Sequence, residues 1–140
     1  MRDSILDCYP TGSIIVADTS AFLTGFAAVL SGTIYTTSDV LYEIKDENSR
    51  NLVERLLNAG KLSIIEPERR FIEIVRNISS KVRTLKKLSE TDIKVLALAL
   101  HLDEKFNCPI YIATDDYSIQ YTAERLKIKI LKMRYKGIKT

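Results

Sequence analysis

Four short acidic segments contain the side chains best suited to chemistry. They read V-A-D-T-S-A-F-L at 16–23, L-Y-E-I-K at 41–45, L-S-E-T-D-I at 88–93 and I-A-T-D-D-Y-S at 112–118. Two follow an apolar, β-branched run and a third opens a strongly apolar helix, so in an α/β fold they are expected to meet at the carboxyl edge of the strands. Two carboxylates about 5 Å apart repel by roughly 3 kcal/mol at an effective dielectric constant of about 20. Such a cluster predicts a site for a divalent metal ion.

Each candidate carboxylate also has an ordinary structural interpretation. Asp18 can be a helix N-cap, which stabilises by about 1 kcal/mol, and Asp115 and Asp116 can form a plain turn before a helix. Glu43 lies on the flank of the apolar stripe of its predicted helix, where most glutamates are surface residues. Asp92 belongs to an S-x-x-D arrangement close to a capping box, but the helix that follows is apolar on nearly every side and is predicted to be buried. Single positions are weak signals, and their joint placement favours function.

Other kinds of catalytic site are disfavoured. His101 is the sole histidine and is predicted to face solvent, and no Ser-His-Asp set or glycine-rich phosphate loop can be assembled. Cys8 and Cys108 are the only cysteines and form no C-x-x-C pair, which argues against a structural zinc site built from this chain alone. Tyr117 and Tyr121 are spaced i, i+4, which is typical of packing, with base stacking as the less favoured alternative.

Positive charge is concentrated in two stretches, although the net charge of +3 is mild. Residues 76–87 and 125–140 are basic and contain no acidic residue. Such stretches are usually solvated faces, but two of them beside an acidic cluster favour a polyanion, which needs neutralised phosphates as well as a metal ion. The candidate phosphate contacts are Lys81, Arg83, Lys86, Lys87, Lys132 and Arg134.

The elements that must position these residues alternate between strand and helix patterns. Strands are predicted at 14–17, 33–36, 62–65, 110–113 and 127–133. Helices are predicted at 21–30, 38–46, 48–59, 68–85, 90–106 and 118–126. This order predicts an α/β fold, a three-layer α/β/α domain with a mainly parallel central sheet.

The chain length predicts one domain, over 1–134, followed by a basic tail at 135–140. The first residues lack an apolar signal core, and no run is long enough to span a membrane. A cytoplasmic protein without a membrane partner is therefore expected.

The acidic segments resemble the motifs of the PIN-domain nucleases, and the resemblance runs from residue 14 to about 133. D-T-S-A-F at 18–22 is similar to the opening motif of the family. Within it, the resemblance is closest to the Nob endonucleases, which cut the 3′ end of small-subunit ribosomal RNA. The segments that carry this likeness are E-I-K-D-E-N-S-R at 43–50, L-S-E-T-D-I-K-V-L-A-L-A-L at 88–100 and T-D-D-Y-S-I-Q at 114–120.

The resemblance implies a PIN-like fold and a metal-dependent endoribonuclease. It implies one or two Mg²⁺ or Mn²⁺ ions and hydrolysis by water, with small-subunit precursor rRNA or a pre-ribosomal particle as the partner. The implied metal-binding acids are Asp18, Glu43, Asp92 and Asp116, with Asp115 as an alternate or partner, and the implied orienting hydroxyls are Ser20 and Thr114.

Two alternatives stay open. One is a VapC-type toxin ribonuclease, which would cut tRNA or another RNA and would have an antitoxin partner. The other is a PIN fold that binds RNA or protein without catalysis. Nob proteins usually carry a zinc ribbon after the PIN domain, and because its cysteines are missing here, no zinc is expected in this chain.

Overall fold

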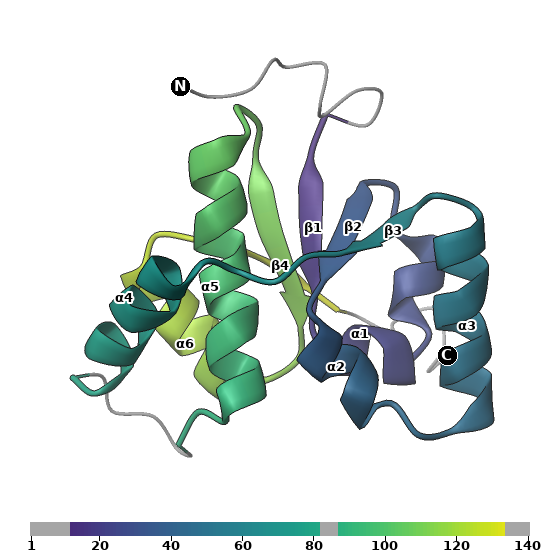
Figure 1. Ribbon diagram of the computed structural model, residues 1–140, viewed down its shortest axis with the longest axis horizontal. Helices are drawn as coiled ribbons and strands as arrows, with labels where there is room; N and C mark the ends of the chain where they lie inside the picture. The colour runs from purple at the N-terminus through teal and green to yellow at the C-terminus, as the bar shows by residue number, and fades with distance from the viewer. Residues whose placement is uncertain (1–11, 82–86, 134–140) are drawn as a thin grey trace.

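The computed structural model describes residues 12–81 and 87–133 (Figure 1). The strands are β1 (Ile14–Ala17), β2 (Thr33–Thr36), β3 (Leu62–Ile64), β4 (Ile110–Thr114) and β5 (Lys129–Lys132). The helices are α1 (Thr19–Leu23), the 3₁₀ helix η2 (Phe26–Val29), α2 (Ser38–Glu43), α3 (Glu47–Asn58), α4 (Arg69–Ser79), α5 (Glu90–Lys105) and α6 (Tyr117–Arg125). The predicted alternation of strands and helices is confirmed.

The five strands form one parallel sheet in the order β3-β2-β1-β4-β5. Ile15 of the central strand β1 pairs with Ile34 of β2 on one side and with Tyr111 of β4 on the other. Figure 1 shows α1 and α3 on one side of the sheet and α4, α5 and α6 on the other, which confirms the three-layer α/β/α fold. Because the chain leaves β1 toward β2 but returns to β4 on the opposite side, a topological switch point lies between β1 and β4, where α/β sheets bind ligands.

The burial of residues in the core agrees with the segments that were predicted to be apolar and buried. All four residues of β1 are buried, as expected for a parallel strand covered on both faces by helices. Helix α5 packs against α4 as well as the sheet, so nine of its residues are buried, among them Val95, Leu96 and Leu98.

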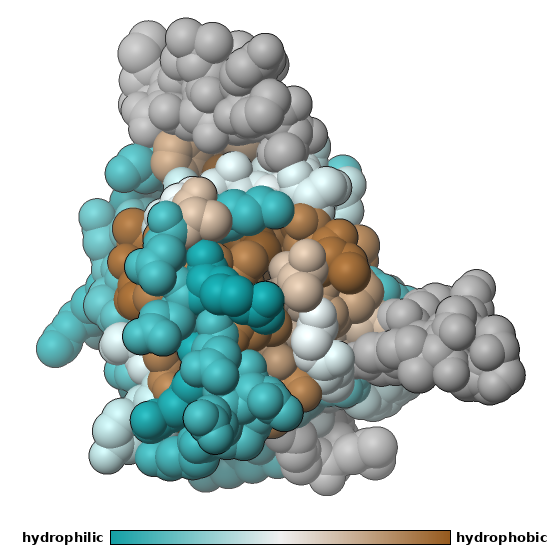
Figure 2. All heavy atoms as spheres, turned by 90° about the vertical axis from the view of Figure 1, so that its right-hand side faces the viewer, coloured by the Kyte–Doolittle hydropathy of each residue, from teal (hydrophilic) through white to brown (hydrophobic). Residues whose placement is uncertain are grey.

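Figure 2 shows the face that carries α3, where hydrophilic side chains cover much of the surface. None of the helices in the described ranges is long and apolar enough to cross a membrane.

The prediction of one continuous helix at 21–30 is wrong, because the structure has two short helices there. Helix α1 ends at Leu23, and Gly25 has φ +82°, a left-handed conformation that favours glycine and ends the helix before η2 begins. The predicted helix at 38–46 is too long, because α2 ends at Glu43 and Asp46 instead caps α3 by accepting from the Ser49 amide at 2.9 Å. Helix α4 ends at Ser79, and residues 82–86 of its predicted extension lie outside the described residues.

His101 takes part in packing between α4 and α5. Its ring is half-buried and stacks on Phe71 with the ring centroids 5.1 Å apart. Its Nδ1 accepts a hydrogen bond from the Glu68 amide at 3.2 Å, at the start of α4. The expectation that His101 faces solvent is therefore only partly right, because its contacts hold α4 against α5.

Candidate active site

The five predicted acids line one cleft at the carboxyl edge of the sheet. Its volume is about 310 Å³, and the other lining residues are Thr19, Ser20, Leu23 and Ser89. Asp18 follows β1 and Asp115 and Asp116 follow β4, so the two neighbouring strands at the switch point deliver three of the acids. Glu43 ends α2 and Asp92 lies in the first turn of α5. The structure thus brings all five together, while their role as metal ligands stays a prediction.

Asp18 is the most buried of these acids, with 5% of its surface exposed. It occupies the N-cap position of α1 but its side chain makes no capping hydrogen bond. Its Oδ2 instead accepts a hydrogen bond from the Thr114 hydroxyl at 2.8 Å. Burial raises the pKa of Asp18 to about 6; hydrogen bonds from Thr114 and the Thr19 backbone oppose this rise, and the charges of Asp92 and Asp116 add to it. The carboxylate is therefore held where its negative charge is costly.

Glu43 is held by two hydroxyl groups from different helices. Thr19 Oγ1 of α1 donates to Glu43 Oε1 at 2.9 Å, and Thr91 Oγ1 of α5 donates to Oε2 at 2.7 Å. Sequence reasoning missed both threonines. The available signal was position, because Thr19 directly follows Asp18 and Thr91 directly precedes Asp92, so each threonine adjoins a cleft aspartate.

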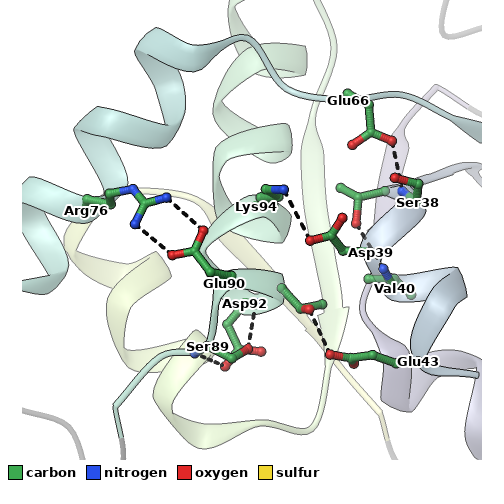
Figure 3. Close-up of polar contacts among 12 residues, drawn as sticks. Ser38, Asp39, Val40, Glu43, Glu66, Arg76, Ser89, Glu90, Asp92 and Lys94 are labelled. Carbon is green, nitrogen blue, oxygen red and sulfur yellow. Dashed lines mark hydrogen bonds and ion pairs between the residues drawn. The ribbon is translucent and has the colours of Figure 1, made fainter.

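Asp92 fulfils its ordinary structural interpretation as well as lining the cleft. Its Oδ2 accepts from the Ser89 amide at 3.0 Å and its own amide donates to Ser89 Oγ at 3.1 Å, which completes a capping box (Figure 3). Nearby, Lys94 Nζ lies 3.2 Å from Asp39 Oδ2 and ties α5 to α2. This ion pair joins the first turn of α2 to α5, the two helices that carry Glu43 and Asp92.

Thr114 connects the two strands at the switch point. Its hydroxyl donates to Asp18 and accepts from the Asp116 amide at 3.0 Å, so one side chain positions both residues. Asp116 is half-buried and caps α6, with Oδ1 accepting from the Ile119 amide at 3.1 Å. Asp115 is exposed, and its amide donates to Ser20 Oγ at 3.3 Å. Ser20 was predicted to orient a carboxylate, and the contact found for it is to this backbone group.

The donor set of the cleft suits a hard divalent cation. Every candidate ligand is a carboxylate oxygen, the kind preferred by Mg²⁺ and Mn²⁺. No three of the described acids already form a complete ligand set for one ion, but Mg²⁺ in proteins usually takes only one or two carboxylates and keeps several waters. The repulsion that Asp92 and Asp116 exert on Asp18 is also what a bound cation would relieve. The residues therefore fit such an ion.

The predicted phosphate contacts are only partly described. Lys81, Lys87 and Lys132 are exposed. Arg83, Lys86 and Arg134, together with the predicted tail at 135–140, lie outside the described residues. Arg76, which opens the first basic stretch, makes two contacts of 2.7 Å with the Glu90 carboxylate (Figure 3). Because this guanidinium is already paired, the stretch offers less unpaired positive charge than its composition suggests.

Comparison with known proteins gives concordant matches. Residues 15–102 match the family model described as "PIN domain of ribonuclease". Ribonuclease VapC3 of Aeropyrum pernix is 42% identical over 138 residues, covering 98% of this chain and 99% of the relative. Endoribonuclease Nob1 of Pyrococcus abyssi is 36% identical, covering 89% of this chain and 71% of the relative. Endoribonuclease Nob1 of Methanocaldococcus jannaschii is 40% identical, with coverages of 90% and 60%.

Proposed function

The chain belongs to the PIN-domain ribonuclease family, and from this premise we propose that it is an endoribonuclease dependent on Mg²⁺ or Mn²⁺. The observation that carries the proposal is the convergence of Asp18, Glu43, Asp92 and Asp116 on one cleft at the switch point. Acids so arranged serve metal-assisted hydrolysis better than any other chemistry that the cleft residues allow, since the cleft contains no histidine, cysteine or lysine among the described residues that line it.

The carboxylate ligands of the cation would come from among these four acids, with Asp115 as a further candidate, and water would fill the other positions around the ion. When bound, the cation supplies a lowered pKa to a coordinated water and stabilises the charge that develops on the phosphate. The protein side chains do the positioning. Thr114 fixes the Asp18 carboxylate against Asp116, and the two threonine hydroxyls on Glu43 hold both of its oxygens. Such hydrogen bonds fix ligand orientation before the substrate arrives.

Metal removal tests this proposal. Incubation of the purified chain with single-stranded RNA and Mg²⁺ or Mn²⁺ is expected to give internal cuts whose products carry a 5′-phosphate and a 3′-hydroxyl. EDTA should abolish the cuts and added metal should restore them. The readout is the fragment pattern, with ligation of an adaptor to report the 5′-phosphate. Cleavage that continues unchanged in EDTA contradicts the proposal.

For the biological substrate we propose the 3′ end of small-subunit precursor rRNA, met in the cytoplasm within a pre-ribosomal particle. Support comes from the two Nob1 relatives and from the Nob-like segment at 88–100. A toxin ribonuclease with an antitoxin partner is the second candidate, favoured by the relative named VapC3, to which the likeness extends over 99% of its length. A single cut at the mature 3′ end of a precursor fragment supports the first, and preferential cutting of tRNA supports the second.

RNA phosphates are proposed to contact the exposed lysines Lys81, Lys87 and Lys132. The same proposal covers Arg83, Lys86 and Arg134 on sequence grounds alone. These contacts would hold the RNA backbone and carry no sequence information. The paired Arg76 is left out of this set.

The hydroxyl of Thr91 is expected to matter for metal binding. Thr91→Val keeps the shape of the side chain but removes the donor to Glu43 Oε2, and loss of such an orienting contact lowers metal affinity or activity by about 10-fold to 100-fold. The measurement is the cleavage rate against Mn²⁺ concentration. Thr91→Ser, which retains the hydroxyl, should recover most of the loss. Equal metal dependence in Thr91→Val and wild type would show that the contact does not orient a ligand.

A further inference from the structure

A second concave surface lies between α6 and β5. Its volume is about 330 Å³, and it is lined in part by Tyr117 and Tyr121 of α6, by Ile128 and Ile130, and by Lys132. A volume above about 300 Å³ is within the range of pockets that bind small ligands. We refer to this surface as the tyrosine groove.

The tyrosine groove adjoins the acid cleft. Tyr117 directly follows Asp116, a cleft residue, and begins α6. Gln120, another groove residue, donates from Nε2 to the Thr114 carbonyl at 3.1 Å. Lys132 pairs in register with Thr114 across the β4–β5 ladder, and neighbouring strands lie about 4.8 Å apart. The groove and the cleft therefore adjoin at the carboxyl end of β4.

The side chains of the groove are those of a stacking platform. Tyr117 is 64% exposed, so the packing expected from its i, i+4 spacing with Tyr121 accounts for little of its ring. Tyr121 is half-buried, and the Arg125 guanidinium lies 4.9 Å from its ring centroid while donating to its hydroxyl at 2.8 Å. The groove lining thus combines two tyrosine rings with one basic side chain, Lys132, and one acidic side chain, Glu124. Aromatic rings next to a basic side chain are what proteins use to hold the stacked bases and the phosphates of single-stranded RNA.

We propose that the tyrosine groove receives an unpaired RNA base next to the bond that is cut. The base stacks on Tyr117 and the adjoining phosphate contacts Lys132. This inference rests on the proposed function, because it requires RNA in the neighbouring cleft. The apolar part of the groove, Ile128 and Ile130, suits the face of any base, so the subsite selects single-stranded RNA and not one sequence.

A double-mutant cycle on RNA affinity, which combines removal of one base with substitution of Tyr117, tests the proposal. The full chain carrying Asp18→Asn, which is expected to prevent cleavage, is titrated with a fluorescent single-stranded RNA and with versions that lack one base at each position in turn. Base–aromatic stacking is worth about 1–3 kcal/mol, so one abasic position should weaken binding by roughly 5-fold to 150-fold. Adding Tyr117→Ala should abolish the penalty at that position and leave the other positions unchanged. Tyr117→Phe keeps the ring and should keep the penalty.

The outcomes separate this proposal from the proposed function. One outcome is that removing a base weakens RNA binding equally with and without the Tyr117 ring at every position. That result overturns the groove as a base subsite, even if the wild-type chain cuts RNA with metal. A penalty that depends on Tyr117 supports the groove, even if the wild-type chain never cuts RNA, in which case only the endoribonuclease proposal fails.

Discussion

Asp92→Asn is expected to lower the rate of RNA cleavage by about 100-fold to 10,000-fold while helix α5 stays folded. The asparagine side-chain oxygen can still accept the hydrogen bond from the Ser89 amide, so this hydrogen bond of the capping box is retained. What is lost is a negative charge among the acids of the cleft, where the proposed metal ion would contribute several kcal/mol to the transition state. Each 1.36 kcal/mol corresponds to about a tenfold change in rate. Single-turnover cleavage at saturating protein is the measurement.

Glu90→Gln provides the matched control. Glu90 lies in the same turn of α5, is exposed and pairs with Arg76, and is not among the residues that line the cleft. The same carboxylate-to-amide change should therefore leave the cleavage rate within about twofold, since exposed ion pairs contribute roughly 0–1 kcal/mol. If both variants lose activity equally, a general change of charge at the start of α5 explains the loss and Asp92 has no special role.

Asp18→Asn is expected to raise the stability of the metal-free protein at pH 7 by about 3 kcal/mol. The pKa of Asp18 is about 6 in the fold against an ordinary value of 3.8, and each pH unit of difference corresponds to 1.36 kcal/mol, which gives about 3 kcal/mol. Between these two values the unfolded chain has released the Asp18 proton and the folded chain retains it. The contribution of Asp18 to the free energy of unfolding therefore falls as pH rises through this window, and its penalty is absent below the window and complete above it.

Denaturant unfolding of both proteins in EDTA across this pH range tests the expectation. The difference in their free energies of unfolding should grow through the window and then level off. Asp46→Asn is a useful comparison, because hydrogen bonds from Ser49 lower the pKa of Asp46 and its effect on stability has the opposite sign. Saturating Mg²⁺ should narrow the gap between Asp18→Asn and wild type by stabilising the wild type. Parallel pH curves for the two proteins in EDTA would rule out a raised pKa at Asp18.

The central strand β1 and the helix α5 were predictable because most of their residues are buried. β1 and β2 are found with the predicted bounds. β1 is a short apolar run because both of its faces are covered, whereas β2 alternates between partly buried and buried residues. The break within the predicted helix at 21–30 was not predictable from its apolar pattern, because the break depends on the positive φ adopted by Gly25. Hydrophobic periodicity reports burial and says little about a single backbone angle.

The carboxylates of the site were predictable where strand order alone brings them together. Asp18 and Asp116 follow adjacent parallel strands, so their proximity requires only the sheet. The threonine pair on Glu43 depends on how the end of α2 meets α1 and α5, contacts between residues 24 and 48 positions apart. The Arg76–Glu90 pair likewise depends on how α4 lies against α5. Such contacts arise from helix placement, which local patterns do not encode.

The hydrogen bond between Asp18 and Thr114 joins residues 96 positions apart, and it has a consequence for synthesis. During synthesis β1 emerges from the ribosome early. Its partner strand β4 and the acids that follow β4 emerge only after most of the chain has been made. Pairing of such distant strands carries a loop-closure cost that local helices do not bear. A growing chain therefore contains Asp18 long before it can form the assembled cleft, which requires β4 to join the sheet.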